Sequence, residues 1–452
     1  MADDLTAALG SLSVTAADAP PAPKDLTAWV NPAGGTTAAD GEFKMDFEGK
    51  REIVDAARVA ELLATAQQGG RVDFTTVSLA NKSYTAEGAA ALAEVLRTFK
   101  STEVANMADI IAGRMEAEAL VVLKTICDAL GHLDLREVDL SDNALGEKGV
   151  RCCEAILLNK QSLEALWFNN NGISAECAAV IVEIVTSTQP TKLRLFHFHN
   201  NMSGPAGAVA LATIVQSSPL LRDLRFSGTR CLTDGSLAMA KGVAALVETQ
   251  VAAGGAGLFV NLDLADNSFG GEGSALLAQA ISAGQPALRV LNLRDAGLGD
   301  DGATAVCDAV AGTAPGLVTL ELSGNEITEE SIGAVAACAA AKPQLSTLGL
   351  EENELGSAGA LLLAAALAKM EANATLTSLS LSTNEMSSDG AIAVAKALKG
   401  FSALSKLGFN GNMFSESRLA SLEAELEANG HKAALGEDPF DENDASGDED
   451  DE

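Results

Sequence analysis

The sequence predicts an α/β fold, a curved solenoid with short parallel strands on its concave face and helices on its convex face. The first observation is the pattern L-x-x-L-x-L-x-x-N, which Leu163 to Asn171 shows clearly, with Phe168 at the third apolar position. The second is its recurrence, about every 28–31 residues over most of the chain. The third is that Ala- and Leu-rich stretches, which favour helices, separate the copies. The pattern is typical of a leucine-rich repeat.

Each copy places a strand at its apolar positions and a turn at its last residue. The turn residues are Asn143, Asn171, Asn201, Thr229, Asn267, Ala296, Asn325, Asn353, Asn384 and Asn412, with Asn81 as a looser first match. Repeats of this length leave room for a full helix on the convex side, a length shared with ribonuclease-inhibitor-like horseshoes.

We divide the chain into three parts. Residues 1–42, rich in Ala, Pro, Thr and Asp, are predicted to be disordered. Residues 43–430 form the repeat domain, which begins with a hairpin over 43–54 that caps the first strand and a helix over 56–68. A helix over 415–429 closes the last repeat. Residues 431–452 form an acidic tail that we also expect to be disordered.

Composition excludes several classes of function. The 452 residues carry a net charge of −32, which argues against binding nucleic acid or anionic membranes and favours a basic protein partner. No apolar run reaches about 18 residues, so we expect no membrane span. The cysteines form no C-x-x-C motif and are interpreted as reduced core residues: Cys127, Cys152, Cys153, Cys177, Cys231, Cys307 and Cys338.

One repeat breaks the pattern. The interval between Asn81 and Asn143 is long enough for two repeats, so a strand must lie near residues 103–111. That copy lacks an Asn at its turn, and Arg114 follows Gly113. A local departure inside a regular array indicates a candidate functional site.

Neighbouring asparagines in the repeat at 163–173 are expected to differ in role. Asn171 belongs to the turn ladder, whose side chains hydrogen-bond to buried backbone groups of adjacent turns. Asn170 precedes it and is expected to project toward the rim at the carboxyl end of the strand. It is either a functional residue or an ordinary surface-loop residue.

The strand position between the two core residues faces the concave surface. In the early repeats it holds Trp167, His197 and Arg225. Because Trp and Arg are common interface hot spots, a partner is expected to contact this half, the alternative being a solvated face. His197 and His199 share a strand, but no third ligand is evident, so a surface pair is favoured over a metal site.

No motif for small-molecule catalysis is present. We find no phosphate-binding loop, no H-E-x-x-H, no G-x-S-x-G and no set of kinase motifs. The absence of such motifs in a repeat protein indicates a protein-binding scaffold.

Three segments together resemble the Ran GTPase-activating proteins, over about residues 43–452. They are Asp109-Ile110-Ile111-Ala112-Gly113-Arg114, Leu140-Ser141-Asp142-Asn143-Ala144-Leu145-Gly146 and Leu166-Trp167-Phe168-Asn169-Asn170-Asn171-Gly172. The resemblance implies that Asn170 and Arg114 are the catalytic residues. Within these segments, Asp109, Asn143 and Asn169 are expected to join Trp167, His197 and Arg225 in contacting the partner.

The resemblance also implies the partner and the mechanism. The chain would act on the GTP form of the small GTPase Ran, with or without a Ran-binding protein, and would accelerate hydrolysis of Ran-bound GTP. Asn170 would orient Ran's own catalytic Gln, while Arg114 would support the site without entering the nucleotide pocket. The chain would need no cofactor or metal, because Ran binds GTP and Mg²⁺. It would thus be an activator, with the chemistry in its partner.

The resemblance sets further expectations. We expect a monomer that serves nucleocytoplasmic transport in the cytoplasm, either throughout it or in its perinuclear region. Plant members carry an additional N-terminal domain with a Trp-Pro-Pro motif, whereas this chain offers only Trp29-Val30-Asn31-Pro32. We therefore expect a green algal or plant-lineage member that lacks this domain. The alternative function is a non-catalytic repeat scaffold or inhibitor that binds a protein on its concave face.

Overall fold

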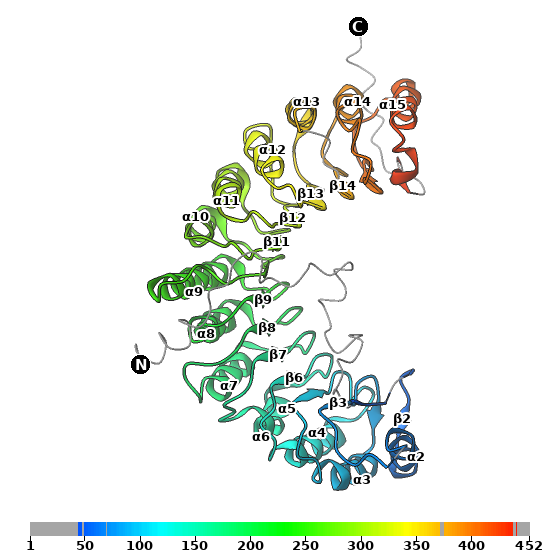
Figure 1. Cartoon of the computed structure of the whole chain (residues 1–452), viewed down its shortest axis with the longest axis vertical. Helices are drawn as coiled ribbons and strands as arrows, with labels where there is room; N and C mark the ends of the chain where they lie inside the picture. Colours follow the sequence, from blue (N-terminus) through cyan, green and yellow to red (C-terminus); the bar gives the residue numbers. More distant parts are fainter. Residues whose placement is uncertain (1–43, 48, 69, 371–374, 437–439, 441–452) are drawn as a thin grey trace. The chain divides into compact units, whose positions relative to one another are not determined.

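A computed structural model of the chain describes residues 44–47, 49–68, 70–370, 375–436 and 440. Two compact units divide these residues, one over 44–231 and the other over 232–440. In each unit, parallel strands lie on one side and helices on the other (Figure 1). The predicted α/β leucine-rich-repeat fold is therefore confirmed. The segment 1–42 and most of the predicted acidic tail lie outside the described residues.

The main sheet of the first unit is parallel, and its strands follow chain order. Its strands are β1 (Lys44–Asp46), β3 (Thr76–Ser78), β5 (Val104–Asn106), β6 (Glu137–Asp139), β7 (Ala165–Trp167), β8 (Leu195–His197) and β9 (Asp223–Arg225). Its helices are α2 (Ala56–Ala66), α3 (Ala86–Leu96), α4 (Glu116–Leu130), α5 (Gly146–Cys152), α6 (Glu154–Leu157), α7 (Ala175–Val185) and α8 (Gly204–Gln216).

The second unit repeats this arrangement. Its parallel strands are β10 (Asn261–Asp263), β11 (Val290–Asn292), β12 (Thr319–Glu321), β13 (Thr347–Gly349), β14 (Ser378–Ser380) and β15 (Lys406–Gly408). Its helices are α9 (Leu232–Ala252), α10 (Gly270–Ser282), α11 (Gly299–Thr313), α12 (Ile332–Ala340), α13 (Gly356–Leu367), α14 (Ser388–Ala397), α15 (Glu416–Ala428) and a 3-10 helix η2 (Lys432–Leu435). In the part of the chain that the structure describes, no helix is long and apolar enough to cross a membrane.

The core of each unit is built by the central residue of each three-residue strand. Val138, Leu166 and Phe196 are aligned on β6, β7 and β8, and all three are fully buried. Because such side chains stack from repeat to repeat, one truncation to Ala would cost about 2–5 kcal/mol. The regularly spaced apolar residues of the sequence are therefore the residues of this buried stack.

The beginning of the repeat domain differs from the prediction. The predicted hairpin is wrong for the described residues of this segment: β1 pairs in parallel with β3, and β2 (Ile53–Val54) pairs in parallel with β4 (Ser83–Tyr84). The chain therefore adds a repeat-like turn before the first repeat. Parallel pairing covers the edge of β3 as a hairpin would, and it also extends the stack of buried residues with Met45.

A column of buried asparagines connects the turns, as predicted. Asn171 donates from Nδ2 to Leu140 O at 3.0 Å and accepts from Asn143 N at 2.8 Å. In the other unit, Asn353 Oδ1 likewise accepts a hydrogen bond from Asn325 N at 2.9 Å. These bonds satisfy backbone groups that would otherwise be buried without partners.

The first match, Asn81, was wrongly placed in this column. Strand register aligns Val77 with Ala105 and Ala105 with Val138, so Lys82 holds the ladder position of that repeat. Lys82 is buried, and its Nζ donates to Lys50 O at 2.8 Å. Asn81 instead has φ +57 and occupies the exposed position before the ladder.

The end of the domain was also placed too early. Helix α15 matches the predicted closing helix, but ordered structure continues through η2 to Gly436. The buried His431 lies with Nε2 3.0 Å from Leu398 O. Because this histidine satisfies a carbonyl at the end of α14, residues 431–436 belong to the cap and not to the tail.

Candidate functional site

The irregular repeat contains a loop between β5 and α4 that is fixed on both sides. In this repeat Ile110 takes the ladder position and is fully buried. Its N–H donates to Asn143 Oδ1 at 2.9 Å, and its carbonyl accepts from Tyr84 N at 3.1 Å. Ser83 Oγ donates to Ala112 O at 2.6 Å. The loop therefore has a fixed path although its turn has no Asn.

Asp109 sits in this loop with φ +55 and is only 4% exposed. Arg51, from the segment between β1 and β2, donates from Nε to Asp109 Oδ2 at 2.8 Å and makes a second contact through Nη2. A buried carboxylate requires such charge-assisted partners. Asp109 is thus a paired structural residue, and Arg51 is a site residue that sequence reasoning missed.

Arg114 lies just before α4 and follows Gly113, whose φ is +74. Its side chain is 16% exposed, and Nη1 lies 3.6 Å from Glu118 Oε2, one helical turn ahead. Its Nε is buried without a hydrogen-bond partner among the described residues. The Nε–H donor of Arg114 is therefore not committed to any described residue.

A pocket of about 620 Å³ collects these groups. Its lining includes Arg51, Asp109, Arg114, Asp142 and Asn170, together with Asn143. The two predicted catalytic residues, 56 positions apart, therefore face one cavity. The predicted partner-binding residues Asp109 and Asn143 also line it.

Asn170 is exposed, with φ +52, at the carboxyl end of β7. Its Nδ2 donates to Asp142 Oδ1 at 2.8 Å, and its Oδ1 accepts from Asn200 Nδ2 at 2.8 Å. Asn169 and Asn143 are buried instead, and their side-chain oxygens accept from the backbone N–H groups of His199 and Ile110. Of these residues, only Asn170 presents an amide at the rim.

The sequence predicts that Trp167 and His197 face a partner, but in the structure both side chains are almost fully buried. Trp167 is 4% exposed and His197 is 2% exposed. Their rings pack edge to face with centroids 6.1 Å apart, and His197 Nε2 lies 2.8 Å from Asp223 Oδ1. Neighbouring strands therefore engage both side chains, and Arg225 is half-buried. Their contact with a partner stays a prediction.

Two titratable groups on this strand face have shifted pKa values. Burial, followed by repulsion from Arg225 and His197, lowers the pKa of His199 to about 3. Burial also raises the pKa of Asp139, against opposing hydrogen bonds from Ser141. Within the described residues, no three His, Cys, Asp or Glu side chains form a group that could hold a metal ion.

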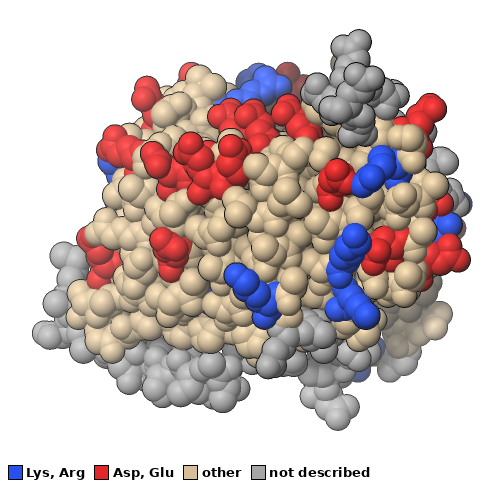
Figure 2. Space-filling model, turned by 90° about the horizontal axis from the view of Figure 1, so that it is seen from above, with Lys and Arg blue, Asp and Glu red and all other residues tan. Residues whose placement is uncertain are grey.

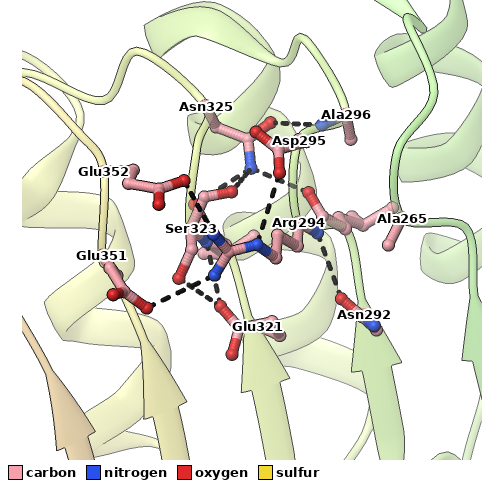
Figure 3. A network of polar contacts seen from close by, with 12 residues as sticks. Ala265, Asn292, Arg294, Asp295, Ala296, Glu321, Ser323, Asn325, Glu351 and Glu352 are labelled. Carbon is pink, nitrogen blue, oxygen red and sulfur yellow. Dashed lines mark hydrogen bonds and ion pairs between the residues drawn. The ribbon is translucent and has the colours of Figure 1, made fainter.

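The second unit has a different electrostatic character. Arg294 lies among carboxylates, 3.3 Å from Asp295, 3.3 Å from Glu351 and 2.7 Å from Glu352 (Figure 3). Glu321 bends over Gly349, where a Cβ would come within 2.0 Å of its Oε1. The small residues of the late strands therefore leave room for acidic side chains of their neighbours.

Acidic side chains gather along one edge of the face drawn in Figure 2. This distribution agrees with the net charge of −32. Such a surface attracts basic partners and repels polyanions.

Comparison with known proteins first gives the class. A family model described as Leucine Rich repeat matches residues 132–152, 285–307 and 372–395. The chain is thus a leucine-rich-repeat protein. An internalin from Listeria monocytogenes matches 93% of this chain and 92% of its own with a TM-score of 0.44 and 14% identity.

The curated relatives narrow the class. "RAN GTPase-activating protein 2" of Arabidopsis thaliana is 40% identical over 122 residues, which is 26% of this chain and 22% of the relative. "RAN GTPase-activating protein 1" of the same plant is 37% identical over 131 residues, covering 28% and 24%. The "Ran GTPase-activating protein 1" of Xenopus laevis is 29% identical over 190 residues, covering 38% and 32%.

The matched segments thus span between about a fifth and a third of these relatives' lengths. The comparisons bear out the resemblance inferred from the sequence: parts of this chain are similar to proteins named Ran GTPase-activating protein, and it has the leucine-rich-repeat fold.

Proposed function

We propose that the chain accelerates hydrolysis of GTP bound to the small GTPase Ran. The observation that carries the proposal is that Arg114 and Asn170 line one pocket at the rim of the first unit. The relatives' names support the same activity. The chain would act as a GTPase activator, with the bond cleaved in its partner.

The proposed mechanism uses Asn170 as a fixed neutral amide. Ras-type GTPases bind the phosphates and Mg²⁺ themselves, and a Gln of the GTPase orients the attacking water. An exposed amide held by two neighbours can hydrogen-bond that Gln and keep it in one rotamer. Removing this disorder lowers the entropic part of the barrier. Known activators gain about 10⁵-fold, or about 7 kcal/mol.

Arg114 is proposed to support the site from the pocket wall. Its side chain is mostly covered and follows the fixed loop of the irregular repeat. An arginine that enters a nucleotide pocket must extend away from its own protein. The covered position of Arg114 favours a role in shaping the surface that receives the partner.

The remaining parts of the proposal concern the cell. The partner is the GTP form of Ran, and the chain acts as a monomer without a cofactor of its own. Its place is the cytoplasm, where it serves nucleocytoplasmic transport. The acidic surface would raise the association rate with basic regions of the partner in a salt-dependent manner.

The test is single-turnover hydrolysis by purified Ran·GTP with substoichiometric amounts of the full chain. We expect rapid hydrolysis with the wild type and a loss of at least about 100-fold, roughly 2.7 kcal/mol, with Asn170→Ala or Arg114→Ala. Tight binding without acceleration would overturn the proposal in favour of the scaffold.

Matched controls exist for both variants. Asn159 is exposed with φ +57 in the same unit, so Asn159→Ala imposes the same backbone strain away from the pocket. Arg97 is exposed at the end of α3 and pairs with Glu94 on the same helix, so Arg97→Ala removes a comparable charge. Both controls should retain the wild-type rate.

A further inference from the structure

Three exposed side chains at the same position of consecutive repeats form a short row joined by hydrogen bonds. Asp142, Asn170 and Asn200 have φ values of +63, +52 and +53. Asn170 donates to Asp142 at 2.8 Å, and Asn200 donates to Asn170 at 2.8 Å. The three residues therefore connect three turns along the rim, with Asn170 in the middle.

The chemistry of Asp142 determines the donor-to-acceptor direction of the hydrogen bonds in this row. A carboxylate only accepts hydrogen bonds, whereas an Asn amide has one donating and one accepting end. The NH₂ group of Asn170 must therefore face Asp142. Its oxygen then faces Asn200, which must turn its own NH₂ group toward it.

Among the described residues, the neighbours at the two ends of this row do not reverse its direction. The next residue in the column beyond Asn200 is Gly228, with φ +59 and no side chain. On the other side Asp109 is buried and paired with Arg51. The orientation of the Asn170 amide is therefore determined by Asp142 and relayed to Asn200.

We infer that Asp142 and Asn200 are positioning residues that fix which end of the Asn170 amide faces each neighbour. The inference rests on the proposed function. With two bonds made inside the protein, Asn170 has one N–H and one oxygen lone pair left for a partner. A reversed amide would exchange them, and a Gln of the GTPase would then meet the wrong group.

The test reverses the direction of this row of hydrogen bonds by exchanging the residues at its two ends, 142 and 200. In Asp142→Asn/Asn200→Asp, the new carboxylate at 200 accepts from Asn170, and the new amide at 142 donates to it. Both hydrogen bonds and the net charge are retained, and Asn and Asp both tolerate positive φ. The exchange turns the Asn170 amide by about 180° and changes little else.

The single variants make a different prediction from the double variant. In Asp142→Asn or Asn200→Asp, the two neighbours of Asn170 become alike, so both amide orientations are populated. We expect each single variant to lose about twofold in hydrolysis rate, as its competent fraction halves. The double variant should lose at least about tenfold.

The experiment compares the wild type, the two single variants and the double variant. It measures the single-turnover rate of hydrolysis with the protein in saturating excess over Ran·GTP, the affinity for Ran·GTP and the unfolding in urea. We expect the double variant to be as stable as the wild type and to bind Ran·GTP with an affinity within a few-fold of the wild type, so that its loss appears in the hydrolysis rate. A purely structural role predicts the reverse order, with the exchange restoring activity.

The outcomes separate the two claims. Wild type without acceleration overturns the proposed function. An active wild type with an equally active double variant overturns the positioning role alone. If the double variant is unstable, the single variants decide, because unchanged rates in both also overturn the inference.

Discussion

Arg51 Nε lies 2.8 Å from Asp109 Oδ2, although the two residues are 58 positions apart. The bond connects the segment before the first repeat to the loop that carries Arg114. The capping segment is thereby part of the candidate site, because its arginine lines the same pocket as Asn170.

Arg51→Ala should destabilise the first unit by about 1–3 kcal/mol, because it leaves the buried Asp109 carboxylate without its partner. Urea unfolding measures this. Arg97→Ala removes an exposed pair and should cost less than about 1 kcal/mol. Equal effects of the two substitutions would show that the Arg51 pair has no special weight.

Adjacent asparagines should separate stability from activity. Asn171→Ala removes buried ladder bonds and should cost about 2–4 kcal/mol, since two backbone groups lose partners. Asn170→Ala should cost about 1 kcal/mol, mainly from positive φ, yet abolish most activation. Thermal unfolding and Ran·GTP hydrolysis, measured on both variants, check this. A strongly destabilised Asn170→Ala would contradict the separation.

Gly113→Ala should reduce activation through the backbone. Its φ of +74 disfavours any side chain, while a Cβ there meets nothing within 4 Å. The expected cost is about 1–2 kcal/mol of strain in the loop before Arg114. Gly254→Ala is the matched control, with φ +84 and equally open space in the second unit. It should lose similar stability and no activity.

His199 should make the first unit less stable in acid. Its folded pKa, lowered to about 3, lies below the ordinary value of about 6.5, so the unfolded chain binds the proton more readily. The stability associated with this group is complete above about pH 6.5 and decreases as pH falls toward 3. His199→Gln should show a smaller loss between pH 7 and 4 in urea titrations. Parallel curves for the two proteins would refute the assignment.

The fold was predictable because its core is local and repeated. Leu166 and Asn171 follow the pattern of every regular repeat, and each repeat contacts mainly its neighbours. The parallel pairing of β1 was not predictable, because three residues carry no signal for strand direction. Lys82 was missed because a buried lysine in an asparagine column breaks the pattern that defines the column.

The candidate site was predictable only where the pattern failed. The missing Asn at Ile110 directed attention to Arg114, and the doubled Asn directed it to Asn170. Arg51 has no such signal, because its partner is set by strand pairing between distant segments. The roles of Asp142 and Asn200 depend on which atoms donate, which a sequence does not specify.

The column of residues with positive φ, each one position before the ladder, has a consequence for engineering. It includes Asn81, Asp109, Asp142, Asn170 and Asn200, one from each successive turn of a parallel sheet. Adjacent strands are about 4.8 Å apart, so the positions of this column are evenly spaced. Moving the Asp-Asn-Asn triplet by one repeat would shift the central amide by one strand spacing while leaving the stacked core unchanged. The same scaffold could thus be engineered to activate a GTPase of slightly different shape.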